Sequence, residues 1–180
     1  DEAYPGDVVG LVNPGLFTIG DTLTSDPALT FDPIPHFAPE CFGLLRTQDI
    51  SKHKQFQKGL KQLEEEGVMQ IFYSPDHVRR EPVLAAVGEL QFDVVMSRLE
   101  NEYGVKTSVE RLPHALARWI VGDPATISAV YWPSDTIRLV DQQGSGVMLF
   151  TTEHLLAYCI KSNPSIKFLL REEVEQTSAQ

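Results

Sequence analysis

The side chains that offer chemistry in this sequence are a pair of carboxylates, a few histidines and a run of lysines and arginines. Glu89 and Asp93 stand four residues apart, so both carboxylates lie on one face of a helix, and paired carboxylates can act as general acid and base. The same two charges also fall at the expected start of that helix, where they complement the helix dipole. We expect this structural role and assign no catalytic residue.

The histidines do not have the spacing of a metal site. They lie at positions 36, 53, 77, 114 and 154, without an HExxH or CxxC pattern around them. The sequence also lacks GxxxxGK[ST], GxGxxG and GxSxG, the loops that hold nucleotide phosphates or present a nucleophilic serine. We therefore expect no metal ion and no bound cofactor, and we expect Cys41 and Cys159 to be free thiols.

A cluster of basic residues is the candidate contact surface. The net charge of −10 argues against a broad electrostatic grip on nucleic acid by the chain as a whole. Lys54, Lys58 and Lys61 nevertheless recur at helical spacing, on a stripe displaced from the apolar positions of the same predicted helix. Such a stripe either keeps a helix solvated or contacts phosphate groups or an acidic partner. The complete candidate set is Arg46, Lys52, Lys54, Lys58, Lys61, Arg79 and Arg80.

Residues 87–105, VGELQFDVVMSRLENEYGV, organise the elements that position these side chains. Phe92, Val95, Met96, Leu99 and Tyr103 recur at i, i+3, i+4, i+7 and i+11, which predicts a helix over 89–103 with one buried face. Gly104 is typical of a left-handed helix stop, and Val105 then begins a strand.

Residues 40–112 predict one antiparallel sheet with two helices. The expected order is strand, helix, strand, strand, helix, strand, over residues 40–46, 52–66, 68–73, 83–87, 89–103 and 105–112. Asp49 or Ser51 can cap the first helix, Gly67 can end it, and the acidic run at 64–66 is expected to be solvated. This order is that of the split βαβ unit, the ferredoxin-like arrangement with both helices on one face.

The same order recurs in residues 116–180. Strands are predicted over 117–121, 136–140, 147–151 and 166–170, with helices over 124–130 and 152–161. The glycine-rich loop DQQGSG, residues 141–146, joins the two middle strands as a hairpin. We expect a second βαββαβ-like unit in an α+β chain, with residues 176–180 as a frayed tail.

Residues 1–37 predict short strands and turns. Strands are expected over 8–12, 16–19 and 22–24, before a proline-rich connector over 31–39. Three short strands cannot bury a core alone, so we expect the last strands of a β-barrel. The predicted domains are therefore 1–37, barrel end and linker; 38–115, ferredoxin-like unit; and 116–180, C-terminal α/β unit.

Several stretches resemble the translational GTPases, and among them the class II release factors. VGELQFDVV at 87–95, RLE at 98–100 and EYGV at 102–105 are similar to the third-domain segment of that family. YPGDVVGL at 4–11 and IGDTL at 19–23 resemble its barrel strands, IPHFAPE at 34–40 its bridge into the third domain, and ARW at 117–119 the strand that follows. The motif shared with the bacterial release factors consists of Gly88, Glu89, Leu90, Gln91, Phe92 and Asp93.

The resemblance implies a C-terminal fragment that begins inside the second domain of a ribosome-dependent GTPase. Such a factor promotes the dissociation of class I release factors from the ribosome after termination, and it holds GTP or GDP with magnesium in a domain absent from this sequence. The implied partners are the class I release factor and the ribosome, through small-subunit protein and ribosomal RNA, in the cytoplasm and without membrane or DNA. The fragment itself would dock and transmit motion without being an enzyme, and residues 33–39 are the candidate hinge.

Two alternatives stay open at this stage. A ferredoxin-like sensor or regulatory module would bind a small molecule between paired units, and the DQQGSG loop could line such a site. A hydrolase of acylphosphatase type would need a phosphate-cradling loop beside an arginine, and no such loop is apparent in the sequence. The RNA-recognition signature of aromatic strand residues is also absent, so base stacking is not expected.

Overall fold

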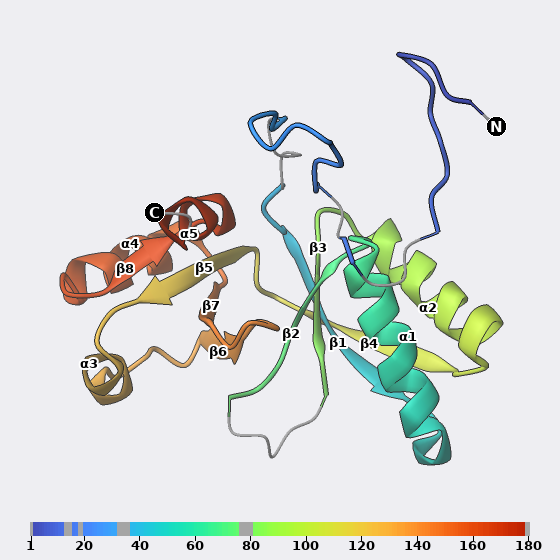
Figure 1. Ribbon diagram of the computed structural model, residues 1–180. Coiled ribbons are helices and arrows are strands. Elements are labelled where there is room, and N and C mark those ends of the chain that lie inside the picture. Colours follow the sequence, from blue (N-terminus) through green and yellow to red (C-terminus); the bar gives the residue numbers. More distant parts are fainter. Residues whose placement is uncertain (1, 13–15, 18–19, 32–36, 76–80, 179–180) are drawn as a thin grey trace. The chain divides into compact units, whose positions relative to one another are not determined.

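The computed structural model describes residues 2–12, 16–17, 20–31, 37–75 and 81–178 (Figure 1). The chain separates into two compact units, Asp1–Ile34 and Pro35–Gln180. The candidate hinge at 33–39 lies mostly outside the described residues, as do Arg79 and Arg80 of the candidate contact surface.

The described part of the first unit contains turns and no strand. The Asp7 amide donates to the Tyr4 carbonyl over 3.0 Å, and the Leu29 amide donates to the Asp26 carbonyl over 3.1 Å. The strands predicted over 8–12 and 22–24 do not form, and the one predicted over 16–19 lies partly outside the described residues. A strand needs a neighbour for its amide and carbonyl groups, and the described residues of this unit supply none. The predicted barrel end is accordingly not seen among them.

The second unit contains two four-stranded antiparallel sheets, and the first is built from residues 41–112. Its strands are β1 (Cys41–Thr47), β2 (Gln70–Phe72), β3 (Val83–Ala86) and β4 (Thr107–Leu112), in the order β2-β3-β1-β4. A 3₁₀ turn, η1 (Ile50–Lys52), leads into helix α1 (His53–Glu65), and α2 (Leu90–Tyr103) joins β3 to β4. Figure 1 shows both helices on the same side of the sheet, an arrangement compatible with the predicted split βαβ unit.

The second sheet repeats this order. Its strands are β5 (Leu116–Val121), β6 (Thr136–Val140), β7 (Gly146–Phe150) and β8 (Lys167–Leu169), in the order β6-β7-β5-β8. Helix α3 (Pro124–Ala129) joins β5 to β6, and α4 (Glu153–Ser162) joins β7 to β8. Both crossover helices are capped at their start, because Asp123 accepts the Thr126 amide and Thr152 accepts the Leu155 amide.

A helix replaces the frayed tail that the sequence predicted at the C-terminal end. Helix α5 (Arg171–Ser178) follows β8 directly, so the prediction of a loose tail over 176–180 was wrong up to Ser178. Glu173 caps its first turn by accepting the Leu170 amide over 2.6 Å, and Val174 packs against buried residues between the sheets. This packing stabilises a segment whose polar composition alone does not predict a helix.

Three hydrophobic clusters show how the second unit is layered. The first lies between the helices α1 and α2 and the first sheet, and includes Phe56, Leu60, Leu84, Phe92 and Leu99. The second, called the inter-sheet cluster here, consists of Phe42, Phe72, Val83, Ala85, Ala117, Trp119, Leu139, Val147 and Leu149. The third lies between the second sheet and helices α3 and α4, and includes Ile120, Ile127, Met148, Phe150 and Leu156. Each sheet therefore has one face on helices and the other on its neighbouring sheet.

Within the described part of the chain, one isolated backbone bridge joins an edge of one sheet to an edge of the other. Tyr73, next to β2, and Val140, at the end of β6, exchange both amide-to-carbonyl hydrogen bonds at 2.8 Å. Beside this bridge the rings of Phe72 and Trp119 meet edge to face, with centroids 5.8 Å apart. The two sheets are thus held by main-chain hydrogen bonds as well as by apolar packing.

Gly59 permits the close approach of α1 to α2. A Cβ at this position would lie 2.7 Å from Leu99 Cδ2 and 2.9 Å from Tyr103 Cδ2, both well inside van der Waals contact. Leu99 is fully buried, so it cannot move away without disturbing the first cluster.

We predict that Gly59→Val lowers the free energy of unfolding by about 1–3 kcal/mol, because the added side chain overpacks the helix contact. Urea unfolding followed by far-UV circular dichroism measures this change. Gly88→Ala is the matched control, since a Cβ there meets nothing within 4 Å and should change stability by less than about 0.5 kcal/mol. A Gly59→Val variant as stable as the wild type would show that the helices separate without cost.

Candidate functional site

The exposed face of α1 carries the lysines of the candidate contact surface. Phe56, Leu60 and Leu63 are buried against the sheet, so Lys54, Lys58 and Lys61 project from the opposite side of the same helix. The Lys61 ammonium lies 3.5 Å from the Glu65 carboxylate one turn later. Lys54 and Lys58 make no hydrogen bond or ion pair within the described ranges. These two side chains are consequently available to an external anion.

Two other members of the predicted set are engaged inside the molecule. The Arg46 guanidinium lies 3.1 Å from Glu81 and 2.6 Å from Glu110, so two carboxylates already balance its charge. The Lys52 ammonium donates to the Gly104 carbonyl over 2.6 Å and so satisfies a free carbonyl at the C-terminal end of α2. The structure therefore brings Lys54, Lys58 and Lys61 together and assigns Arg46 and Lys52 to local contacts.

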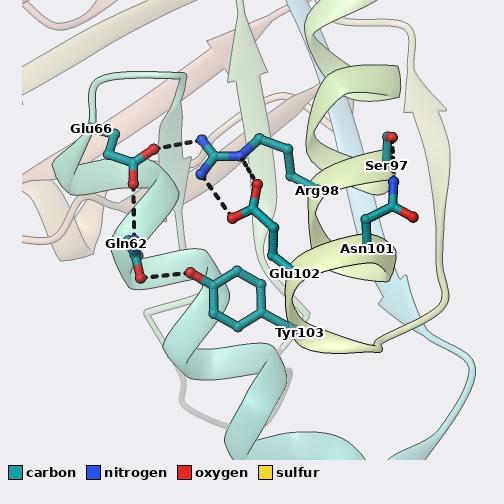
Figure 2. Close-up of polar contacts among 7 residues, drawn as sticks. All are labelled: Gln62, Glu66, Ser97, Arg98, Asn101, Glu102 and Tyr103. Atoms are coloured by element: carbon teal, nitrogen blue, oxygen red, sulfur yellow. Dashed lines mark hydrogen bonds and ion pairs between the residues drawn. The ribbon is translucent and has the colours of Figure 1, made fainter.

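A polar clasp fixes α1 to α2 near the C-terminal end of α1 (Figure 2). Arg98 contacts Glu66 on one side and Glu102 on the other, while the Tyr103 hydroxyl donates to Gln62 over 2.6 Å. The hydrogen bonds from Arg98 lower the pKa of both carboxyls and raise the pKa of the guanidinium. The sequence predicted that the acidic run at 64–66 is solvated, but Glu66 instead ties the two helices together. Local sequence patterns did not indicate this contact, because the partner of Glu66, Arg98, lies 32 residues away.

Gln91 of the motif at residues 88–93 caps the turn that leads into α2. The Gln91 side-chain oxygen accepts the Val87 and Gly88 amides over 2.7 and 3.2 Å, and its nitrogen donates to the Val68 carbonyl over 2.9 Å. Phe92 is buried in the first cluster, whereas Leu90 and Asp93 are exposed. One glutamine side chain therefore joins β3, α2 and the loop that follows α1.

Glu89 and Asp93 both lie at the start of α2, as the spacing predicted. Glu89 forms an ion pair with Arg111 on β4, and this arginine also lies over the Phe92 ring at 5.9 Å. Glu89 thus links the start of α2 to the neighbouring strand instead of facing a reactive partner.

The DQQGSG loop is organised around its own aspartate. Asp141 Oδ1 accepts the Gln143 and Ser145 amides, and Gly144 turns the chain with φ +83°. The other carboxylate oxygen of Asp141, Oδ2, accepts the Trp119 indole N–H over 2.8 Å and lies 3.2 Å from the Arg171 guanidinium. The loop thus supports the inter-sheet cluster, a role that the sequence did not predict because Trp119 and Arg171 are distant along the chain.

Glu64 faces this aspartate and arginine from α1. Partial burial raises the pKa of Glu64 to about 7, and the Asp141 carboxylate adds to that rise, while the Ile71 amide and Arg171 oppose it. Burial together with the Glu64 charge also raises the pKa of Tyr73 to about 12. The joint between the sheets therefore contains a carboxyl that titrates near neutral pH.

The structure indicates no metal centre among the residues that it describes. No group of three or more His, Cys, Asp or Glu side chains is placed to hold a metal ion in the described ranges, and His36 and His77 lie outside them. His114 is buried after β4, and its burial lowers the pKa of the imidazole. Of the helices in these ranges, none has the length and apolarity that crossing a bilayer requires.

Comparison with known proteins identifies a family that the chain resembles. The family model described as class II release factor RF3, C-terminal domain, matches residues 31–160. The chain is similar to peptide chain release factor 3 of Acaryochloris marina, with 47% identity over 167 residues, 93% of this chain and 31% of the relative. Proteins of the same name from Gloeobacter violaceus and Symbiobacterium thermophilum are 47% and 42% identical over 93% of this chain. The chain spans about a third of the length of these relatives, 31–32%.

We predict that Glu64→Gln flattens part of the pH dependence of stability. A carboxyl with its pKa raised from 4.5 to about 7 on folding binds its proton more tightly in the folded chain. The contribution of Glu64 to the free energy of unfolding is therefore fully present below about pH 4.5 and is lost as the pH rises through 7. Urea unfolding at pH 5.5 and pH 8 measures this effect. We expect the free energy of unfolding of Glu64→Gln, relative to that of the wild type, to be higher at pH 8 than at pH 5.5.

The control for this experiment is Glu65→Gln, which removes an exposed neighbouring carboxyl. We expect its stability relative to the wild type to change little between the two pH values. Identical pH profiles for the wild type and Glu64→Gln would mean that Glu64 titrates as an ordinary surface carboxyl.

We predict that Gln91→Ala lowers the free energy of unfolding by about 1–2 kcal/mol, because two amides at the start of α2 and the Val68 carbonyl lose their partner. Gln91→Glu keeps the acceptor but loses the donor, so its stability should fall between the two. Urea unfolding provides the measurement, and Gln55→Ala on the exposed side of α1 is the control. If Gln91→Ala matched Gln55→Ala, the motif would have no capping role.

Proposed function

The chain belongs to the class II release factor RF3 family, as its C-terminal domain, and from this we propose that it is the docking region of a translation-termination GTPase. In this proposal the domain contacts the ribosome and the class I release factor, and so helps that factor to leave after peptide release. The GTPase chemistry belongs to another part of the full-length factor, with GTP or GDP and magnesium bound there. This domain would hold no cofactor and catalyse no reaction.

The lysine face of α1 is the observation that supports docking. Among the residues that the structure describes, no carboxylate pairs with Lys54 or Lys58, although the chain carries ten more acidic than basic residues. Their Cα atoms stand about 6 Å apart along the helix axis, since each residue of an α-helix rises by about 1.5 Å. That spacing suits contact with successive phosphates of an RNA backbone, which dominates the binding of proteins to nucleic acid.

The contacts that hold α1 in place suit a domain that transmits movement. The clasp of Arg98 fixes α1 to α2, Gly59 lets the helices touch, and the bridge at Tyr73 joins the two sheets. A contact on α1 would therefore move the second unit as a packed body instead of bending one helix. Rigid-body movement of this kind is how a nucleotide-dependent change elsewhere in the factor would reach the ribosome.

We predict that Lys54→Glu/Lys58→Glu, placed in a full-length factor that contains this chain, slows the recycling of class I release factors by roughly tenfold while leaving GTP affinity unchanged. Reversing two charges would repel the phosphates that the lysines contact. Release of labelled class I factor from post-termination ribosomes measures recycling, and equilibrium binding of labelled GTP measures nucleotide affinity.

Arg46→Ala is the matched control, because Glu81 and Glu110 already neutralise that guanidinium. Its recycling rate should stay near the wild-type value. Wild-type recycling by the double lysine variant would rule out the α1 face as a ribosome contact.

A further inference from the structure

Two arginines of the second sheet differ from the other described arginines. Arg46, Arg98, Arg111 and Arg171 each hold at least one carboxylate. Arg118 and Arg138 hold none within the part of the chain that the structure describes, although the sequence contains 25 acidic residues. The Arg118 guanidinium donates only to the carbonyl of Ala117, its own neighbour, over 2.7 Å.

The strand register places these two arginines in one row on one face. Arg118 on β5 and Arg138 on β6 are each paired with Met148, which lies on β7 between them. Side chains directly opposite each other in antiparallel strands share a face, and neighbouring strands lie about 4.8 Å apart. The two Cα atoms are therefore about 10 Å apart, a distance that two arginine side chains can close around one anion.

This face is the one covered by α3 and α4, and its apolar side chains are hidden. Met148, Phe150 and Ile120 are buried in the third cluster, whereas Arg138 is exposed and Arg118 is partly exposed. The row therefore offers two guanidinium groups to solvent without an exposed apolar side chain between them. A protein partner normally needs an apolar anchor at the centre of its contact, whereas a phosphate backbone needs only charge and hydrogen-bond donors.

We propose that Arg118 and Arg138 form a second anion site, which binds backbone phosphate of RNA. The planar fork of each guanidinium matches two phosphate oxygens, which a lysine ammonium cannot do. The choice of RNA rests on the proposed function, in which the ribosome is the source of phosphate. The site itself is inferred from the strand register and from the lack of a carboxylate partner for either arginine among the described residues. It lies on the second sheet, whereas the lysine face lies on α1, which packs against the first sheet.

The test uses the chain of 180 residues and a fluorescein-labelled 20-residue oligouridylate, with fluorescence anisotropy measured over a range of potassium chloride concentrations. We expect Arg118→Gln and Arg138→Gln each to weaken binding severalfold and to reduce the slope of log K against log salt by about 1. Arg118→Lys should keep most of the slope, because the charge remains, but should bind more weakly than the wild type because the fork is lost.

Lys167→Gln is the matched control, since this exposed lysine of β8 pairs with Val121, on the side of β5 opposite to Arg118. Its binding should stay near the wild-type value, which separates a site from a general loss of charge. Arg138 is exposed, so Arg138→Gln tests the site even if Arg118→Gln fails to fold.

Unchanged binding and slope in Arg138→Gln would overturn the site. Equal competition by a 20-residue polyglutamate would overturn the choice of RNA and indicate an acidic protein instead. If the arginine variants bind normally while the lysine variants of α1 slow recycling, the proposed function stands and this site falls. If neither set has an effect, both fall.

Discussion

The burial of Trp119 between the two sheets is the constraint on which the second unit depends. Its side chain is fully buried in the inter-sheet cluster and makes an edge-to-face contact with Phe72 of the first sheet. A buried indole N–H costs free energy when it lacks a hydrogen-bond acceptor, and Asp141 supplies one to Trp119. The buried carboxylate in turn needs donors and a positive charge, and it receives them from two loop amides and Arg171. The hairpin loop, the last helix and the sheet contact are therefore one interdependent arrangement.

The first sheet depends on a comparable arrangement at its helices. Gly59 allows α1 and α2 to touch, Gln91 fixes where α2 begins, and Arg98 joins their exposed ends. Because each contact uses groups from different elements, the two helices present a single surface of fixed geometry. An exposed ion pair contributes little stability alone, but the Arg98 clasp is a bidentate contact within a network, and such geometry restricts orientation. These contacts therefore also fix the position of the lysine face on α1.

Local signals in the sequence predicted most of the second unit. Gly67 and Gly104 do adopt φ of +67° at the ends of α1 and α2, as their positions predicted, because such signals act within a few residues. The features that sequence reasoning missed all involve partners far apart in the chain. The neutralisation of Arg46 requires Glu81 and Glu110, and the helix over 171–178 forms where Val174 meets the inter-sheet cluster. The strands predicted in the first unit failed for the same reason, since a strand depends on a neighbour that local pattern cannot supply.

The distribution of carboxylates shows why the excess of acid does not prevent contact with an anion. Electrostatic attraction between exposed groups acts over about 8–10 Å at physiological ionic strength, so the local arrangement matters more than the net charge. In the described ranges, Glu66, Glu89, Glu102 and Asp141 are each paired with an arginine that lies at a helix or sheet junction. These acidic groups thus stabilise internal contacts, and Lys54, Lys58 and the β5–β6 arginines lie outside those pairs. An acidic domain can in this way keep two local positive surfaces on elements that its own ion pairs hold in place.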